Sequence, residues 1–475
     1  MKMSLAKFAI IAALILTSTA YGQQLGLNFN YFGSGARAEG MGNAYLAISD
    51  DGSAATWNPA GLSVHEKTFM VFGYNGFFPR GDYSWYSDQG LLEVYDHTGD
   101  YGSLGALNLI TPLRIKSHHF VASISYTRHF DVYYRFAEEL YDFYPEIETQ
   151  GEPNSFIEKY GGINSINLGI GTRIYKKLSF GVTGNIYYGN VITEENRVVG
   201  AQILENNNPI YYEDRINIID STKFTGFNAS IGFLYAGDRL RAGLVVKTPF
   251  ELRGESDSTL VSILSQNGVV IAQDVLPGSP FFTDTIYVDD MTSRLQMPFM
   301  TGLGLAYSLT DNWLISGDIE YKRFSNKKVK NLVSKVVTAS GDINEEFTDD
   351  INIPNWNDVV QFRLGTEYRW NTKYGMVPIR FGFRNEAFPE GDISGYEIQY
   401  DEDAYKIFYI LNFEENKTTG TSLALGTGIH WSQILLDVAY TYTTYDQQIY
   451  RFADELRSNG DWKNHHLNFT FTGYF

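Results

Sequence analysis

Apolar and polar residues alternate along most of this chain, from about residue 67 to the C-terminus. In residues 178–186 the even positions carry Leu, Phe, Val, Gly and Ile, and the odd positions carry Ser, Gly, Thr and Asn. Residues 166–170 and 434–442 alternate in the same way. Because successive side chains on a strand point to opposite faces, each segment has one apolar and one polar face. The pattern predicts an all-β protein.

A soluble sandwich would show the same alternation, but three features favour a transmembrane antiparallel β-barrel. Glycine is frequent on the polar face, where the interior of a barrel needs room. Charge lies almost wholly on that face, and a Lys or Arg facing lipid at mid-membrane would cost roughly 2–4 kcal/mol. Short and long connections alternate along the chain, as they do in outer-membrane barrels.

The alternating segments predict about 14 strands, an even number that brings the C-terminus back to the side of the N-terminus. We place the strands at residues 67–78, 104–114, 117–130, 163–175, 176–190, 223–237, 238–249, 293–309, 312–324, 357–370, 375–388, 418–430, 431–445 and 462–475. Gly, Asp, Asn, Ser and Lys mark tight turns near residues 116, 176, 237, 311, 372 and 431. The other connections are predicted to be long external loops, and two of them, at residues 77–79 and 260–264, are candidate surfaces for ligand capture.

Residues 1–22 are typical of a secretion signal, with Lys2 and Lys7 before a short apolar run and small residues at the cleavage site. That run is too short to span a bilayer as a helix. The 475 residues include no cysteine, which excludes disulfides and cysteine nucleophiles. The formal net charge of −18 argues against a nucleic-acid partner.

Residues 33–62 interrupt the strand pattern with a Gly- and Ala-rich stretch that no strand fits. A barrel of 14 strands encloses more space than the side chains of its wall fill. A compact coil of small residues suits that interior, with Asn58 and Pro59 setting a turn and Gly61 permitting a positive φ. We therefore expect a signal peptide at 1–22, an N-terminal hatch at 23–64 and a barrel at 65–475. The hatch either fills and gates the lumen or contacts a ligand directly.

This stretch resembles the N-terminal signature of the FadL/TodX family, outer-membrane transporters of long-chain fatty acids and aromatic hydrocarbons. Weaker resemblance follows at Pro298 and at residues 302–304, 318–321, 362–368 and 380–383. The resemblance implies a 14-stranded barrel with a small N-terminal hatch, and a sideways exit where the third strand kinks. Residues 120–128 contain no Gly or Pro that would mark such a kink. The hatch residues singled out by the resemblance are Gly40, Gly42, Asp50, Asp51, Trp57, Asn58, Pro59 and Gly61.

Charged residues gather on the inward faces of three neighbouring predicted strands. One interpretation is a lattice of ion pairs across strands, which would brace the wall and anchor the hatch. The other is that a surplus arginine meets a ligand carboxylate or the Asp50–Asp51 pair. The residues are Asp318, Glu320, Arg363, Glu367, Arg369, Arg380 and Arg384.

No grouping of residues predicts catalysis, a metal site or a cofactor, so we do not expect an enzyme. The sequence predicts a passive channel in the outer membrane of a Gram-negative-type bacterium, for a hydrophobic small molecule such as a fatty acid. The alternative is an outer-membrane carrier of a type IX-like secretion system. Expected partners are the ligand, outer-membrane lipid and the barrel-assembly machinery, because a terminal aromatic such as Phe475 resembles the signal by which that machinery selects barrels.

Overall fold

The computed structural model describes residues 34–87, 90–138, 155–205, 208–276, 286–325, 328–338, 341–343, 347–352, 357–401, 406–451 and 456–475. The predicted signal peptide at 1–22 lies outside these residues, as does the beginning of the predicted hatch. Among the described residues, no helix has the length and apolar character needed to cross a bilayer.

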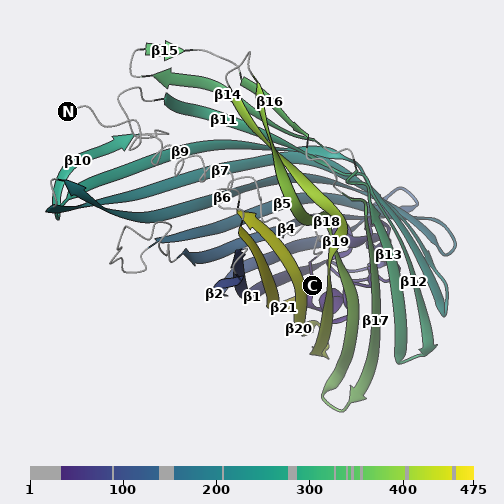
Figure 1. The fold of residues 1–475 in the computed structure, drawn as a ribbon. Helices are drawn as coiled ribbons and strands as arrows, with labels where there is room; N and C mark the ends of the chain where they lie inside the picture. Colours follow the sequence, from purple (N-terminus) through teal and green to yellow (C-terminus); the bar gives the residue numbers. More distant parts are fainter. Residues whose placement is uncertain are drawn as a thin grey trace.

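Fourteen antiparallel strands pair in sequence and close into a ring (Figure 1). The last strand pairs with the first from Phe69↔Tyr474 to Tyr86↔Arg457, so the ring has no free edge over that length. The prediction of a 14-stranded antiparallel barrel is confirmed. In ring order the strands are β1 (Phe69–Ser87), β3 (Tyr101–Ile115), β4 (His118–Glu138), β5 (Ser155–Tyr175), β6 (Leu178–Glu205), β7 (Asn208–Ala236), β8 (Leu240–Lys247), β12 (Met300–Thr310), β13 (Trp313–Lys322), β17 (Val359–Thr372), β18 (Gly375–Asp401), β19 (Lys406–Trp431), β20 (Ile434–Arg451) and β21 (Leu456–Tyr474).

The outer face of the ring is apolar, as expected of a surface in contact with lipid. Alternate residues on β21 are exposed aromatics, Phe469 at 47% and Phe471 at 43%, whereas the intervening Asn468 and Thr472 are buried inside. On β17 the outward Phe362 and Leu364 are exposed in the same way, and Arg363 between them is 1% exposed. The alternation therefore separates a lipid-facing surface from a polar lumen.

The long external loops predicted from the sequence are, in large part, continuations of the strands. β6 and β7 pair from Leu178↔Tyr235 to Glu205↔Asn208, so the strand predicted at 223–237 begins 15 residues earlier, at Asn208. The 29 residues of β7 would extend roughly 95 Å at about 3.3 Å per residue, whereas 9–11 residues suffice to cross a membrane. The barrel wall therefore continues well beyond the membrane on this side (Figure 1).

Further strands lie on this extended side. The strand predicted at 293–309 is in fact two strands separated by Pro298, since β11 pairs with β9 and β14 and only β12 belongs to the ring. The two segments predicted to be capture loops are strand residues, since 77–79 lies in β1 and 260–264 in β9; ligand capture by them stays a prediction. The additional strands are β2 (Gly90–Thr98), β9 (Phe250–Gln266), β10 (Val269–Leu276), β11 (Ile286–Met297), β14 (Lys328–Thr338), β15 (Gly341–Ile343) and β16 (Phe347–Asn352).

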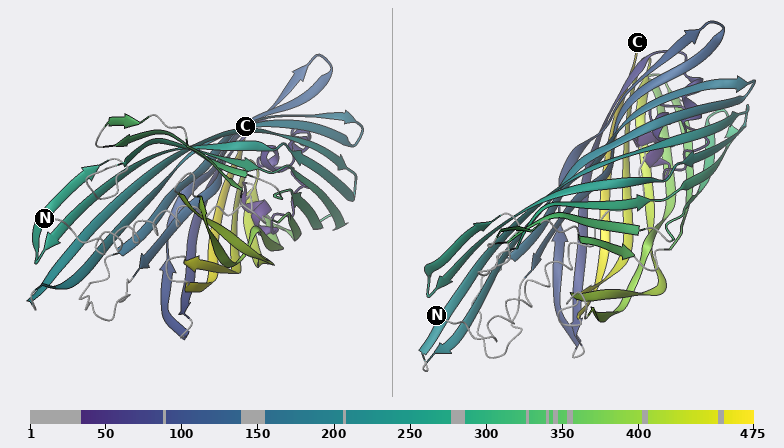
Figure 2. Two further views of the ribbon diagram at one scale, coloured as in Figure 1. Left: turned by 45° about the horizontal axis from the view of Figure 1, so that its top comes forward. Right: turned by 90° about the horizontal axis from the view of Figure 1, so that it is seen from above.

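Residues 34–64, which we call the inner segment, lie inside the ring (Figure 2). They form α2 (Ala36–Gly40), α3 (Ala54–Trp57) and the 3₁₀-helix η1 (Pro59–Val64). α2 packs against β18 to β21, and η1 packs against β4 to β7. Most of their side chains are fully buried, so the segment crosses the lumen from one wall to the other.

Candidate functional site

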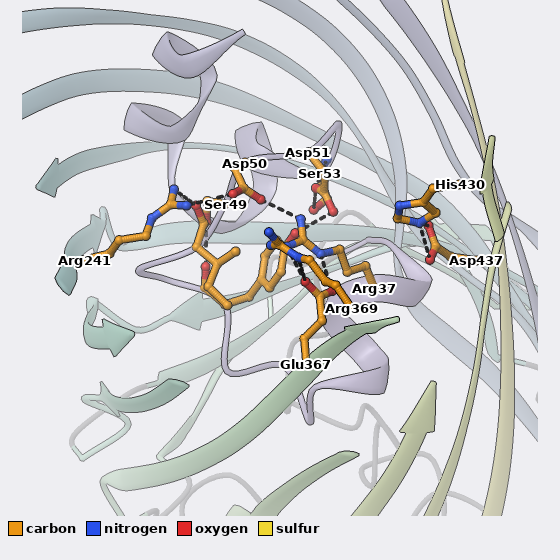
Figure 3. Close-up of polar contacts among 12 residues, drawn as sticks. Arg37, Ser49, Asp50, Asp51, Ser53, Arg241, Glu367, Arg369, His430 and Asp437 are labelled. Carbon is orange, nitrogen blue, oxygen red and sulfur yellow. Dashed lines mark hydrogen bonds and ion pairs between the residues drawn. The ribbon is translucent and has the colours of Figure 1, made fainter. Parts of the chain in front are cut away.

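A chain of ion pairs joins strands β8 and β17 of the wall through the inner segment (Figure 3). From the β8 wall, Arg241 donates from Nη1 to Asp50 Oδ2 at 2.7 Å, and Arg37 donates to Asp50 Oδ1 at 2.6 Å. Arg37 Nε then reaches Glu367 Oε2 of β17 at 2.8 Å. Asp50 and Arg37 thus link two walls, and we call these four residues the tether.

The tether continues through the wall beyond Glu367. Arg380 of β18 donates from Nε to Glu367 at 2.7 Å and from Nη1 to Asp437 of β20 at 2.6 Å. His430 of β19 lies 3.0 Å from the same carboxylate. Glu367 and Arg380 are almost fully buried, so water and salt screen the attraction between their charges only weakly.

Asp50 remains charged because of its two arginine partners. Burial alone would raise the pKa of Asp50, but the Arg37 and Arg241 guanidinium groups hold the pKa of this carboxyl well below its usual range. Asp51 has a different role, since its carboxylate accepts bonds from Tyr45 Oη and from the backbone N–H of Ser53. Of the predicted acidic pair, therefore, Asp50 binds the wall and Asp51 shapes the inner segment.

Wall side chains also bind the backbone of the inner segment. Asp318 of β13 accepts the N–H groups of Tyr45 and Leu46 at 2.7 and 2.9 Å. Ser316 on the same strand donates to the carbonyl oxygen of Ala44. Elsewhere on the wall, Thr441 of β20 and His466 of β21 contact the buried carboxylate of Glu39 in the inner segment. These bonds fix the position of the segment along the barrel axis.

Wall glycines provide the room for this close approach. A Cβ atom at Gly382 or Gly365 would overlap the backbone of residues 41–42, and one at Gly426 would meet Gly40. Gly42 itself has φ +62° and lies against β18. The predicted room on the polar face is therefore present where the segment touches the wall.

The Trp57–Leu62 part of the inner segment turns against β6 and β7. Asn58 donates from Nδ2 to the carbonyl oxygens of Leu46 and Phe233, and its Oδ1 accepts the N–H of Ala60. Pro59 begins the 3₁₀-helix. Gly61 is absent from the positive-φ residues, so that expectation was wrong. Its requirement is proximity, because a Cβ there would overlap the carbonyl oxygen of Ser49.

All seven predicted lumen charges face inward, and six of them form ion pairs, whereas Asp318 accepts backbone N–H groups of the inner segment. Arg363 donates to Glu320 at 3.0 Å, and its guanidinium lies 5.7 Å from the Trp57 ring. Arg384 bonds to Glu386, and Arg369 bonds to Glu367. Arg363 does not meet Asp50. Four further residues take part in these ion pairs and were not predicted from the sequence, namely Arg37, Arg241, Glu386 and Asp437. The inward position of Asp437 in the alternating residues 434–442 could have indicated it.

Above this charged layer, on the side of the extended strands, inward positions become apolar. Glu320 and Lys322 of β13 are followed by Phe324, just past the end of the strand, and on β17 Arg363 is preceded by Val359. These two apolar residues belong to a buried cluster, which we call the apolar cluster, with Phe130, Val132, Ile163, Tyr187, Val191, Phe224, Leu252 and Leu295. The lumen thus contains the apolar cluster next to the charged layer, which we call the charged floor.

Next to the tether, a cavity of about 240 Å³ lies between the inner segment and the wall. Arg37, Asp50, Glu367 and Asp437 line its polar part. Apolar wall residues such as Leu435 line the remainder. The space borders the same contacts that hold the inner segment in place.

The wall has an interruption between β3 and β4. Their ladder runs from Ile115↔His118 to Ala106↔Thr127, and residues 101–104 then pair with β1 while residues from Arg128 onward pair with β5. Side chains cross the interruption, since Ser103 donates to Asp131 and the Tyr101 and Tyr133 rings lie 5.1 Å apart. A register shift at Arg128/Phe130 marks the place, without a Gly or Pro in this strand.

The solved structures most similar to this chain include transporters with the same fold. The toluene transporter TodX of P. putida is 15% identical, with 93% of this chain and 99% of that chain covered and a TM-score of 0.57. The toluene transporter TbuX of Ralstonia pickettii is 14% identical, with 94% and 100% covered and a TM-score of 0.55. A Pseudomonas aeruginosa FadL homologue is 11% identical, with 94% and 99% covered and a TM-score of 0.56.

The fold is therefore that of the FadL/TodX outer-membrane barrels, as the N-terminal signature indicated. A comparison with curated protein sequences found no match. The family model named BamG matches residues 133–381, which is slightly more than half of the chain and includes β5 to β17 of the wall. By this match, the chain belongs to the BamG family.

Proposed function

We propose that this protein is an outer-membrane channel for hydrophobic small molecules, with long-chain fatty acids among its substrates, and that the inner segment is its hatch. Transport is passive diffusion. The ligand enters from the side of the extended strands and binds among the residues of the apolar cluster. It leaves the cluster when the ion pairs of the tether break.

The observation that carries this proposal is the apolar cluster at inward positions. The interior of a water-filled barrel is polar, and apolar side chains there gain nothing unless they pack on one another or on an apolar ligand. Phe130, Tyr187 and Phe224 come from three different strands and converge in one place. Side chains that converge in this way can bury the apolar surface of a ligand that leaves water.

The charged floor favours a ligand with an acidic head over a plain hydrocarbon. Arg363 is 1% exposed, and its Nε and Nη1 atoms are buried without a hydrogen-bond partner in the described structure. Unsatisfied buried donors are costly, and a carboxylate is a good partner for a guanidinium. The named relatives include toluene transporters and a FadL homologue, so both ligand classes deserve testing.

The interruption between β3 and β4 offers a sideways exit. It lies at the same level as Phe130 of the apolar cluster, and it is closed by the Ser103–Asp131 hydrogen bond and by the Tyr101 and Tyr133 rings. Exit toward lipid would avoid the water on the far side of the hatch. No Gly or Pro in β4 marks this route, because the register shift at Arg128/Phe130 irregularly displaces the strand instead.

Mass spectrometry of lipid co-purified with the detergent-extracted protein tests the channel proposal. A bound acyl chain is expected in the native protein, and it should be lost when Tyr187→Glu places a charge in the apolar cluster. Uptake of labelled fatty acid and of labelled toluene by cells then separates the substrates. Native protein without bound acyl chain, together with uptake equal to that of cells lacking the protein, would refute the proposal.

A second candidate function is a protein-binding role without small-molecule transport. The family name BamG follows the naming series of the β-barrel assembly machinery, and the strands that continue beyond the membrane provide a surface for a protein partner. A carrier in a type IX-like secretion system belongs to the same class. Phe475, exposed at 74%, stays the proposed contact for the machinery that inserts the barrel itself. Cross-linking from the extended strands, with identification of the captured protein, distinguishes this candidate from transport.

A further inference from the structure

Three adjacent short turns of the ring carry a concentration of basic residues. The turn between β3 and β4 carries Lys116, that between β5 and β6 carries Lys176 and Lys177, and that between β7 and β8 carries Arg239, all exposed. Because the ring order is β3 to β8, these turns are neighbours. We call these four residues the basic rim.

The basic rim contrasts with the rest of the molecule. Asp238 is the one acidic residue in these three turns, and it pairs with Lys177 at 2.7 Å. The other three short turns, at 311–312, 373–374 and 432–433, contain Lys373 and Asp311, so their charges cancel. The whole chain has a net charge of −18. The basic rim is therefore a local positive patch on a chain whose overall charge is negative.

Two of the lysines occupy positions where a lysine is conformationally unfavourable. Lys116 has φ +56° and Lys176 has φ +36°. Two-residue hairpin turns of this kind prefer Asn, Asp or Gly, which tolerate the left-handed region better. A lysine at both positions indicates that the side chain contributes something that the turn itself does not need.

The basic rim lies at the boundary of the lipid-facing surface. Ile115, Ile174 and Leu240 are 56%, 52% and 48% exposed and are each within two residues of a rim cation. Tyr175 is 64% exposed, and the ammonium of Lys176 lies 5.3 Å from its ring. Aromatic and basic residues together mark the headgroup layer of a membrane, where amines reach lipid phosphates.

We infer that the basic rim binds the headgroups of anionic phospholipids in the leaflet that faces the short turns. The lipid phosphate and the acidic headgroup receive the Lys and Arg side chains, while the acyl chains lie along Ile115, Ile174 and Leu240. Each cation near an anionic surface adds to the attraction. This inference requires the barrel to lie in a membrane and is independent of what the barrel transports.

Native mass spectrometry of the full-length mature protein tests the inference. The protein is mixed with equal amounts of phosphatidylglycerol and phosphatidylcholine of the same acyl length, and the ratio of bound lipids is measured. The test variant combines Lys116→Asn, Lys176→Asn, Lys177→Gln and Arg239→Gln. Asn suits the left-handed positions, so the turns should form at least as well as before. The control is Lys373→Gln, in a short turn outside the rim.

We expect the native protein and the control to prefer phosphatidylglycerol, and the rim variant to lose about tenfold or more of that preference. Heat-modifiable migration on gels verifies that every variant is a folded barrel. Equal lipid ratios for native and rim variant would overturn the inference. So would a photo-cross-linker at Lys177 that captures a protein in cells while the purified barrel shows no lipid preference.

Discussion

The tether makes a direct prediction about what keeps the lumen closed, and the most informative change is Asp50→Asn. Asp50 is the residue through which the inner segment binds Arg241 of β8, and it also joins Arg37. Asparagine keeps the size and one acceptor oxygen but removes the charge. We expect the variant barrel to assemble normally and to conduct ions that the native barrel blocks.

The expected size of the effect follows from the burial of the tether. Removing one partner of a buried ion pair costs about 3–5 kcal/mol. Asp50 is 21% exposed, Arg37 retains Glu367, and Arg241 retains the carbonyl oxygen of Ile48, so we expect a loss at or below the lower end of this range. A loss of roughly 2–3 kcal/mol raises the population of the displaced state roughly 30- to 150-fold, since each 1.4 kcal/mol is a factor of ten.

Single-channel recording in planar bilayers measures this population as the frequency of open events. The matched control is Asp238→Asn, because Asp238 forms an ion pair of the same 2.7 Å length with Lys177 but on an exposed turn. Exposed pairs contribute little, so the control should behave like the native protein. Arg241→Gln should match Asp50→Asn, and the double variant should add little, because both remove the same link.

Open-event frequencies that are equal in Asp50→Asn, Asp238→Asn and native protein would refute the role of the tether in closure. An increase for Asp50→Asn with strictly additive effects of Arg241→Gln would show that the two residues act separately. The sensitivity of cells to antibiotics that the outer membrane normally excludes provides an independent measure. We expect it to rank the variants in the same order as the open-event frequency.

Three further predictions follow from the same geometry. Gly382→Val should displace the inner segment, because its side chain would overlap residues 41–42, and limited proteolysis should then cut near residue 50; Gly184→Ala, with no close contact inside, should be neutral. Arg363→Gln should lower the temperature of unfolding while leaving the choice between fatty acid and toluene unchanged if this arginine only braces the wall, and it should weaken fatty-acid uptake selectively if it meets the carboxylate. Because the pKa of Asp50 is lowered, its stabilising contribution is fully present above its ordinary pKa of about 4 and is lost as pH falls through the lowered value, so open-event frequency should be constant from pH 8 to pH 5 and rise only in strong acid.

The wall could be predicted from the sequence because lipid and lumen impose opposite requirements on neighbouring residues. Residues 178–186 and 434–442 lie where one face meets lipid, and there the alternation is strong. Beyond the membrane the outer face no longer meets lipid, so the requirement for an apolar outer face disappears. Residues 193–205 of β6, with Glu194, Glu195 and Arg197, therefore resembled a loop although they continue the strand.

The inner segment could be predicted in kind but not in its contacts. Its small residues and Asn58–Pro59 indicated a compact coil, and the coil packs against wall glycines as expected. The partner of Asp50 could not be found, because alternation gives the face of a residue and not its height along the barrel. Arg241 lies on a short strand of eight residues, where the pattern was weakest. Gly61 illustrates the same limit, since a sequence does not distinguish a glycine that allows close packing of the backbone from one that allows a positive φ.

The contacts of the inner segment are distributed in a way that favours partial opening over expulsion. One set, formed by Arg241, Asp50 and Glu367, depends on charge and borders the cavity of about 240 Å³. The other consists of directional hydrogen bonds, buried between Asp318 and the backbone of Tyr45 and Leu46 and partly buried between Asn58 and β7. Breaking the first set leaves the second intact, so the segment should pivot beside the cavity while staying attached to β7 and β13. A passage opened in this way would be narrow and reversible, which suits a channel that must admit single apolar molecules without becoming a general pore.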